Sequence, residues 1–283
     1  MRFSVITPSF RQLDWLTLCA ASIADQGVEH EHLVQDAGSP GIEAWMAQHP
    51  QVQVRVEKDE GMYDAVNRGF ARASGEILSY LNCDEQYLPG TLQKVGDYFQ
   101  QHPEIDVLFG DAVLANASHE PVAYRRVISP LAWHTLLRPL GVLTCSTFFR
   151  RKLVEDGVLF DTSWKIVGDK PWVYEIVKRG CQIGTLPEPL SVFVLTGENL
   201  SQDPRRLREK DRWLGGLSPG FRLLTPLVQA HHVWRKWCAG AYHSHRGDLR
   251  YYRSADPTQR ATFADRTLGP SWPKSTPTSS SLL

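Results

Sequence analysis

The chain has 283 residues, 42% of them hydrophobic and 22% charged, which is enough to build a sizeable buried core. Its 31 basic and 31 acidic side chains give a formal net charge of zero, so the composition excludes nucleic-acid binding through bulk positive charge. The five cysteines have neither metal-ligand spacing nor a disulfide framework, and we find no signal peptide or membrane-spanning apolar run, which predicts a cytoplasmic protein.

Apolar runs typical of strands alternate with helical periodicity through the N-terminal part of the chain. We expect strands at residues 3–7, 32–35, 52–56 and 77–81. Apolar residues recur every three or four positions from 13 to 27, around Trp45, from 62 to 73 and from 92 to 99, which predicts helices. This alternation indicates βαβ units, so the sequence predicts an α/β fold with a mostly parallel sheet flanked by helices.

The pattern becomes less regular further along the chain. We expect additional strands at 105–109, 122–127, 144–149 and 183–195. A helix is predicted to open at Asp169 and to end at Gly180, because an Asp precedes a first-turn proline and a Gly follows a basic residue.

The composition changes after residue 202. An arginine-rich stretch is followed by a helix with Leu227, Val228 and Trp234 on one face, which predicts a helical extension. Pro, Ser and Thr then dominate, which is typical of a disordered tail. We therefore divide the chain into an α/β domain at 1–202, a helical extension at 203–253 and a disordered tail at 254–283.

Acidic residues follow three successive predicted strands: Asp36, the group at 57–60, and the pair Asp84 and Glu85. Because the carboxyl ends of parallel strands lie along one edge of a sheet, where open α/β sheets bind ligands, these carboxylates should line one crevice. Oxygen ligands at such an edge suit a divalent cation that also holds phosphate oxygens. The alternative for Asp84 and Glu85 is an ordinary solvated turn.

Six motifs resemble those of family 2 glycosyltransferases in order and spacing, over residues 1–201. They are SVITPSF at 4–10, QDAGS at 35–39, DEGMYDAVNRG at 59–69, GEI at 75–77, LNCDE at 81–85 and TFFRR at 147–151. The resemblance implies the GT-A fold, a Rossmann-like sheet that binds a nucleoside diphosphate sugar. It also implies transfer of the sugar, with inversion, to an acceptor hydroxyl.

The resemblance further implies roles for individual residues. Asp169 matches the catalytic base of the family. Asp84 matches the metal ligand of the Asp-x-Asp motif, with Asn82 in place of the first acid and Glu85 as a substitute ligand or a partner of the ligand. The implied cofactor is Mn²⁺ or Mg²⁺. Nucleotide-sugar contacts are implied for Thr7, Pro8, Ser9, Asp36, Asp59, Asn67, Asn82 and Cys83.

Glycosyl transfer suits these residue types. The departing diphosphate gains negative charge that a cation held by Asp84 would stabilise. The acceptor hydroxyl must lose its proton to a base on the opposite side of the sugar, for which Asp169 is the candidate. The competing interpretation of Asp169 is a helix N-cap, and that of Asp36 is a turn former beside Gly38.

We expect the partners to be a nucleoside diphosphate sugar and a saccharide or lipid-linked acceptor, in the synthesis of a cell-surface or exported polysaccharide. One alternative is a sugar-phosphate nucleotidyltransferase, although the Gly-rich loop of such enzymes is absent after the first strand. Another is a nucleotide-sugar-binding protein with impaired catalysis, which Asn82 favours. The apolar face of the C-terminal helices predicts either packing, homo-oligomer formation included, or a peripheral contact with the inner face of a membrane.

Overall fold

The computed structural model describes residues 1–197, 199, 203–254 and 256–272. The strands are β1 (Phe3–Ser9), β2 (His30–Asp36), β3 (Gln53–Val56), β4 (Ile77–Tyr80), β5 (Glu85–Tyr87), β6 (Val107–Asn116), β7 (Pro121–Arg125), β8 (Thr147–Arg150), β9 (Ile183–Leu195), β10 (His245–Arg253) and β11 (Asp256–Leu268). The helices are α1 (Leu13–Ala24), α2 (Ile42–Gln48), α3 (Met62–Arg72), α4 (Thr91–Gln101), α5 (Ala132–Leu137), the 3₁₀ turn η1 (Thr144–Ser146), α6 (Lys152–Glu155), α7 (Asp169–Lys178), α8 (Arg206–Gly215), α9 (Pro219–Arg222) and α10 (Thr225–Cys238).

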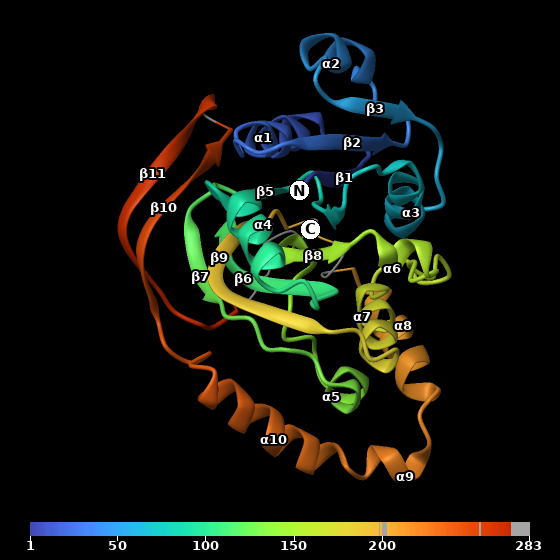
Figure 1. The fold of residues 1–283 in the computed structure, drawn as a ribbon. Coiled ribbons are helices and arrows are strands. Elements are labelled where there is room, and N and C mark those ends of the chain that lie inside the picture. Colours follow the sequence, from blue (N-terminus) through green and yellow to red (C-terminus); the bar gives the residue numbers. More distant parts are fainter. Residues whose placement is uncertain (198, 200–202, 255, 273–283) are drawn as a thin grey trace, which may run out of the picture.

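Within the described ranges, nine strands form one sheet in the order β3-β2-β1-β4-β8-β6-β9-β5, with β7 paired to β6. The N-terminal half is parallel, because β1 pairs with β2 and β4, and β2 with β3. β8 runs antiparallel between β4 and β6, whereas β6 and β9 are parallel again. The predicted α/β fold is confirmed, and the parallel order brings the carboxyl ends of β1, β2, β3 and β4 to one edge (Figure 1).

Helices cover both faces of this sheet (Figure 1). On one face, Ile23 of α1 belongs to a buried cluster that also includes α4. On the other face, Phe70 of α3 and Trp172 of α7 share a second cluster. Gly69 lets α3 approach β1 closely, since a Cβ at this position would collide with the side chain of Ile6. The sheet is therefore packed between two layers of helices.

The ribbon formed by β10 and β11 corrects two predictions from the sequence. The two antiparallel strands curve along the outside of the molecule beside α1 and β7 (Figure 1). Phe263 and Leu268 of β11 are buried in a cluster with Tyr124 of β7, and the Tyr252 hydroxyl donates to Asp25 Oδ2 at 2.9 Å. The helical extension thus ends before β10, and the predicted disordered tail is a strand over Asp256–Leu268. The few apolar residues of this segment do not predict a strand, but packing against β7 stabilises one. Residues 273–283 of the predicted tail lie outside the described residues.

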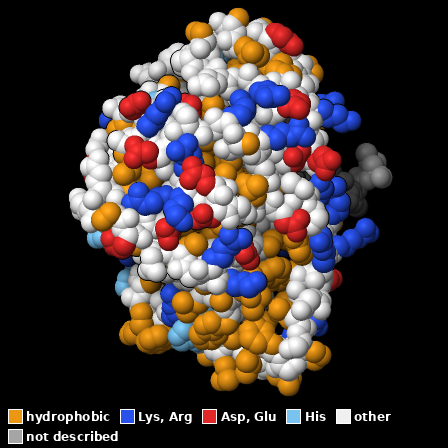
Figure 2. Space-filling model, turned by 45° about the vertical axis from the view of Figure 1, so that its right-hand side comes forward, with side chains coloured by type: hydrophobic (Ala, Val, Ile, Leu, Met, Phe, Trp, Pro, Cys, Tyr) orange, Lys and Arg blue, Asp and Glu red, His pale blue; other side chains and the backbone are white. Residues whose placement is uncertain are grey.

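Helices α8, α9 and α10 lie where the helical extension was predicted. Val228 of α10 is 2% exposed and packs inward, whereas Leu227 and Trp234 are 69% and 57% exposed. Leu223, Leu227, Trp234 and Trp237 are exposed, and we call them the α10 face. Figure 2 shows hydrophobic side chains gathered at the bottom of the molecule, where α9 and α10 lie in Figure 1. Of the three residues predicted to share one apolar face, only Val228 is buried within the chain. Among the described residues, no helix combines the length and apolar character needed to cross a bilayer.

Candidate active site

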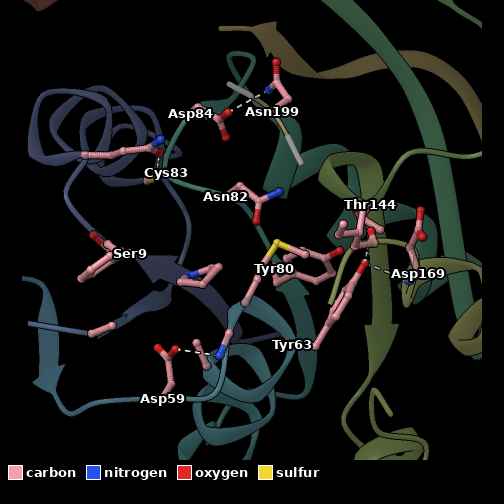
Figure 3. Close-up of a pocket in the computed structure, with 18 of the residues that line it drawn as sticks. Ser9, Asp59, Tyr63, Tyr80, Asn82, Cys83, Asp84, Thr144, Asp169 and Asn199 are labelled. Atoms are coloured by element: carbon pink, nitrogen blue, oxygen red, sulfur yellow. Dashed lines mark hydrogen bonds between the residues drawn. The ribbon is translucent and has the colours of Figure 1, made fainter. Parts of the chain in front are cut away.

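A cavity of about 630 Å³ opens at the sheet edge where β1, β2, β3 and β4 end (Figure 3). Its wall combines residues that follow these four strands with residues from α3, the start of α7 and the segment after β9. They include Pro8, Ser9, Ala37, Lys58, Asp59, Tyr63, Asn82, Cys83, Asp84, Asp169 and Asn199. The structure therefore places the strand ends around one crevice, as the parallel topology predicts.

Five residues predicted to contact the nucleotide sugar line this cavity: Pro8, Ser9, Asp59, Asn82 and Cys83. The Ser9 hydroxyl is buried and has no hydrogen-bond partner in the part of the chain that the structure describes, so it is available to a ligand. Asp59 Oδ1 accepts the Gly61 N–H at 2.9 Å, and burial raises the pKa of this carboxyl. That bond fixes the turn before α3, where Gly61 has a φ of 121°.

Thr7 and Asp36 do not line the cavity, which differs from the predicted direct contacts. Both are 0% exposed. Thr7 Oγ1 of β1 lies 2.9 Å from His32 Nε2 of the neighbouring strand β2. The Asp36 carboxylate accepts the backbone N–H groups of residues 38 and 39 at 2.9 and 2.6 Å and the Ser39 hydroxyl at 2.7 Å. Asp36 therefore stabilises the turn after β2, which is the alternative that its sequence context left open.

Asn67 is also absent from the cavity wall. Its amide Nδ2 donates to the Phe160 carbonyl at 2.8 Å, and its Oδ1 accepts the Phe160 N–H at 3.0 Å. The side chain thus ties α3 to the segment before α7 and leaves neither end free for a nucleotide sugar.

The turn after β4 places Asn82 and Asp84 on the cavity wall, while Glu85 is outside the lining. Glu85 is 1% exposed, and its Oε2 accepts the Asn82 N–H at 2.8 Å, so it supports the turn from within. Asp84 Oδ2 accepts from Asn199 Nδ2 at 3.0 Å (Figure 3). Burial raises the pKa of both carboxyl groups, and the Asp84 charge raises that of Glu85 further.

The residues of this turn fit a divalent cation. Asn82 Oδ1 is buried without a hydrogen-bond partner among the described residues, so it offers a free oxygen on the same turn as the Asp84 carboxylate. Mg²⁺-type ions are usually held by one or two carboxylates together with substrate phosphates. The described residues contain no group of three or more His, Cys, Asp or Glu that could hold a metal by themselves. A cation at this turn would therefore need oxygen ligands besides Asn82 and Asp84.

Asp169 is the first residue of α7 and lies on a different side of the cavity from Asp84 (Figure 3). Its N–H donates to the Tyr63 hydroxyl at 3.1 Å, and its Oδ1 accepts the Lys170 N–H at 2.9 Å. The helix N-cap position is Gly168, where a Cβ would lie only 2.6 Å from the Tyr63 ring. Burial raises the pKa of the Asp169 carboxyl from its ordinary 3.8 to about 6.

The loop that leads into Asp169 is held by the C-terminal extension. Glu209 of α8 accepts the backbone N–H groups of residues 165, 166 and 167 at 2.8, 3.1 and 3.0 Å. Three N–H groups converging on one carboxylate are a strong anchor, because hydrogen bonds to a charged acceptor are worth about twice those between neutral groups. Helix α8 of the helical extension thus helps to position Asp169 in the cavity.

The sequence reasoning missed Tyr63, Asn199 and Glu209. Tyr63 stands inside the motif at 59–69, so the motif was a signal for it, and its hydroxyl also donates to the Ile166 carbonyl at 2.9 Å. Asn199 lies 115 residues from its partner Asp84, and Glu209 lies 42 to 44 residues from the backbone groups that it binds. No local spacing in one sequence marks either of them.

The sequence matches the family described as glycosyl transferase family 2 over residues 4–158, and the chain belongs to this family. An uncharacterized glycosyltransferase of Mycobacterium tuberculosis is 35% identical over 232 residues, which are 76% of this chain and 83% of that protein. A PGL/p-HBAD biosynthesis glycosyltransferase of Mycobacterium bovis is 31% identical over 124 residues, or 41% of this chain. The match spans about half the length of that relative, 48%.

Solved structures show the same GT-A fold. The 1–349 portion of S. aureus TarS in complex with UDP-GlcNAc aligns with a TM-score of 0.63 and 18% identity, covering 84% of this chain and 73% of that one. A mannosyltransferase from Pyrobaculum calidifontis in complex with GDP-Man and Mn²⁺ aligns with a TM-score of 0.56 and 18% identity, covering 84% and 72%. At these identities the likeness establishes the fold alone.

Proposed function

We propose that the chain is an inverting, metal-assisted glycosyltransferase that moves a sugar from a nucleoside diphosphate sugar to an acceptor hydroxyl. The observation that carries this proposal is that Asp59, Asp84 and Asp169 meet in one cavity from three separate parts of the chain. Two proteins of the same fold bind UDP-GlcNAc or GDP-Man, which supports a nucleotide-sugar donor.

We assign the donor to the strand-end side of the cavity. Ser9 offers a free hydroxyl there, and Asp59 a partly buried carboxylate. Asp84 and Asn82 would hold Mn²⁺ or Mg²⁺ together with the diphosphate. When bound, this ion supplies positive charge that stabilises the departing diphosphate.

Asp169 is assigned as the general base. The acceptor hydroxyl attacks the anomeric carbon from the face opposite the diphosphate, so the base must lie away from the metal-holding turn. Asp169 meets this requirement, and its pKa of about 6 suits a carboxylate that is ionised at neutral pH and still accepts a proton readily.

The test is to incubate the purified chain with Mn²⁺ and a panel of nucleoside diphosphate sugars, and to measure release of the nucleoside diphosphate. Release from one donor, stimulated by an acceptor, is the expected result, and the anomeric configuration of the product determines whether transfer inverts. Donor binding without any release would favour the impaired nucleotide-sugar-binding protein suggested by Asn82. Formation of a nucleoside triphosphate and a sugar 1-phosphate when pyrophosphate is added to the same mixture would instead indicate a nucleotidyltransferase.

We further propose a saccharide or lipid-linked acceptor in the synthesis of a cell-surface or exported polysaccharide, and a location on the cytoplasmic side of the membrane. All five cysteines are free, which supports a reducing compartment. The exposed α10 face supports a peripheral membrane contact, with association of two copies through this face as the alternative.

A further inference from the structure

Another cavity lies between the end of β7, the turn after α5 and helix α10. It measures about 200 Å³ and shares no lining residue with the cavity that contains Asp84 and Asp169. Among the described residues, no Asp or Glu lines it. Its Lys and Arg lining residues are Arg125, Arg126, Arg138 and Lys236. Four like charges around one small space repel one another unless an anion balances them.

The chain itself balances little of this charge. Asp111 Oδ2 lies 4.0 Å from Arg126 Nε. Asp111 is 0% exposed, however, and its carboxylate already accepts the Tyr124 hydroxyl and the Val127 N–H, each at 2.7 Å. One carboxylate committed to two other donors leaves the cluster with a positive excess.

Most of the unpartnered polar atoms around the cavity are nitrogens. Arg126 Nε, Arg138 Nε and His232 Nδ1 are buried without hydrogen-bond partners in the part of the chain that the structure describes, as is one acceptor, Gln229 Oε1. Buried polar atoms of native proteins nearly always have a partner, whether protein, water or ligand. Burial lowers the pKa of Lys236, and the charges of Arg125 and Arg138 lower it further. A bound anion would remove both the missing bonds and the repulsion.

We propose that this cavity binds a phosphate-type oxyanion through Arg138, Arg126 and Lys236. A guanidinium group pairs with two phosphate oxygens at once, and a lysine adds a compact charge. The proposal does not depend on the proposed transferase activity, because none of these residues lines the cavity assigned to the donor.

The phosphate can belong to a soluble phosphorylated compound or to a lipid headgroup. Helix α10 contributes to both surfaces: Val233 and Lys236 line the cationic cavity, while the adjacent Trp234 and Trp237 are 57% and 68% exposed. A headgroup in the cavity would therefore leave its acyl chains close to the α10 face. Both sources would present a phosphate group to the cavity, so an experiment has to distinguish a soluble ligand from a lipid.

The experiment compares the full chain with the double variant Arg138→Gln, Lys236→Gln. The matched control is Arg206→Gln, Arg208→Gln, which removes the same charge from exposed positions on α8. Binding of inorganic phosphate and of pyrophosphate is measured by calorimetry. Binding to vesicles of phosphatidylcholine, with and without phosphatidic acid, is measured by sedimentation. Circular dichroism verifies the fold, and Arg138→Lys replaces the double variant if that variant does not fold.

We expect binding to weaken at least about tenfold in the double variant and to stay within about twofold in the control, since each lost charged hydrogen bond costs more than a factor of ten. Loss of phosphate binding supports a soluble ligand. Loss of phosphatidic-acid-dependent sedimentation alone supports a lipid headgroup. If neither probe binds the native chain, or if both double variants lose binding equally, the cavity is not an anion site and the proposal is wrong.

Discussion

Asp169 is the residue on which the proposed chemistry most depends. Asn has the size of Asp, and its amide oxygen can still accept the Lys170 N–H, but it cannot accept a proton from the acceptor. We expect Asp169→Asn to lower kcat by about a hundredfold or more, within the range for loss of a general base, with little change in donor KM. Initial rates of nucleoside diphosphate release measure this effect.

The stability of this variant provides the control. The raised pKa of Asp169 means that the folded state holds the proton more tightly than the unfolded state, so this group lowers the free energy of unfolding as pH rises from about 4 to about 6. At pH 8, Asp169→Asn should therefore unfold at the same temperature as the native chain or higher. An unfolded variant would identify Asp169 as a structural residue.

The same pKa predicts the pH dependence of transfer. Because the base must be ionised, kcat of the native chain should fall about tenfold per unit as pH drops below about 6. Rates between pH 4.5 and 8 measured with saturating donor and Mn²⁺ would show this limb. A rate that is flat through this range would contradict a role for Asp169 as the base.

Asp84 carries the proposed metal contact. Asp84→Ala removes the one cavity-lining carboxylate of the β4 turn, and loss of a metal contact costs several kcal/mol in the transition state. We expect activity to fall more than about tenfold and Mn²⁺ dependence to weaken. Asp14→Ala, an exposed carboxylate on α1, is the matched control. A variant that keeps both its Mn²⁺ dependence and most of its activity would show that other residues hold the ion.

At the scale of elements, α8 supports the loop that leads into Asp169, the proposed base. Arg212 of α8 donates to the Ser163 hydroxyl at 2.9 Å, and its guanidinium lies 4.0 Å from the centre of the Trp164 ring. With the Glu209 bonds, these contacts fix the loop before Asp169 from outside the family-matched segment.

We therefore expect Glu209→Ala to lower kcat about tenfold or more while donor KM changes little, since small displacements of catalytic groups have large effects on rate. The pH profile should also shift, because the surroundings of Asp169 change. Asp211→Ala, an exposed acid on the same helix, should retain native rates. Equal losses in both variants would mean that α8 acts only through stability, which thermal unfolding would show.

At the scale of the whole molecule, the α10 face is an apolar surface that the described residues leave exposed. Trp234 and Trp237 beside exposed leucines are typical of helices that lie in a membrane interface. We expect Trp234→Glu to reduce sedimentation with anionic vesicles at least about fivefold, because a charge would replace an exposed indole that the membrane interface would bury. Val56→Glu, an exposed apolar residue on β3 at the opposite end of the molecule in Figure 1, is the control.

Light scattering on the same proteins separates the two interpretations of this face. If the native chain is dimeric in solution, becomes monomeric in Trp234→Glu and does not sediment with vesicles, then the α10 face is an interface between copies and the membrane proposal is wrong.

The sequence by itself determined the class of the protein and the residues at the strand ends. Alternating strand and helix patterns reflect local periodicity, so they predicted the α/β sheet. Because parallel strands end at one edge, the order of elements also predicted that Asp59, Asp84 and their neighbours would meet. The helix start at Asp169 was legible because the adjacent proline and the later glycine act locally.

Only the tertiary structure decided which of these side chains face the cavity and what holds them. Asp36 and Asp84 both follow strands, yet one is enclosed by its own turn and the other faces the cavity, a difference set by packing. The roles of Glu209, the cationic cavity and the strand β11 were not legible from local sequence, because each depends on residues from another part of the chain: residues 165–167 for Glu209, β7 and α10 for the cavity, and Tyr124 for β11. Burial raises the pKa of Asp169 for the same reason: desolvation depends on neighbours that local sequence does not name.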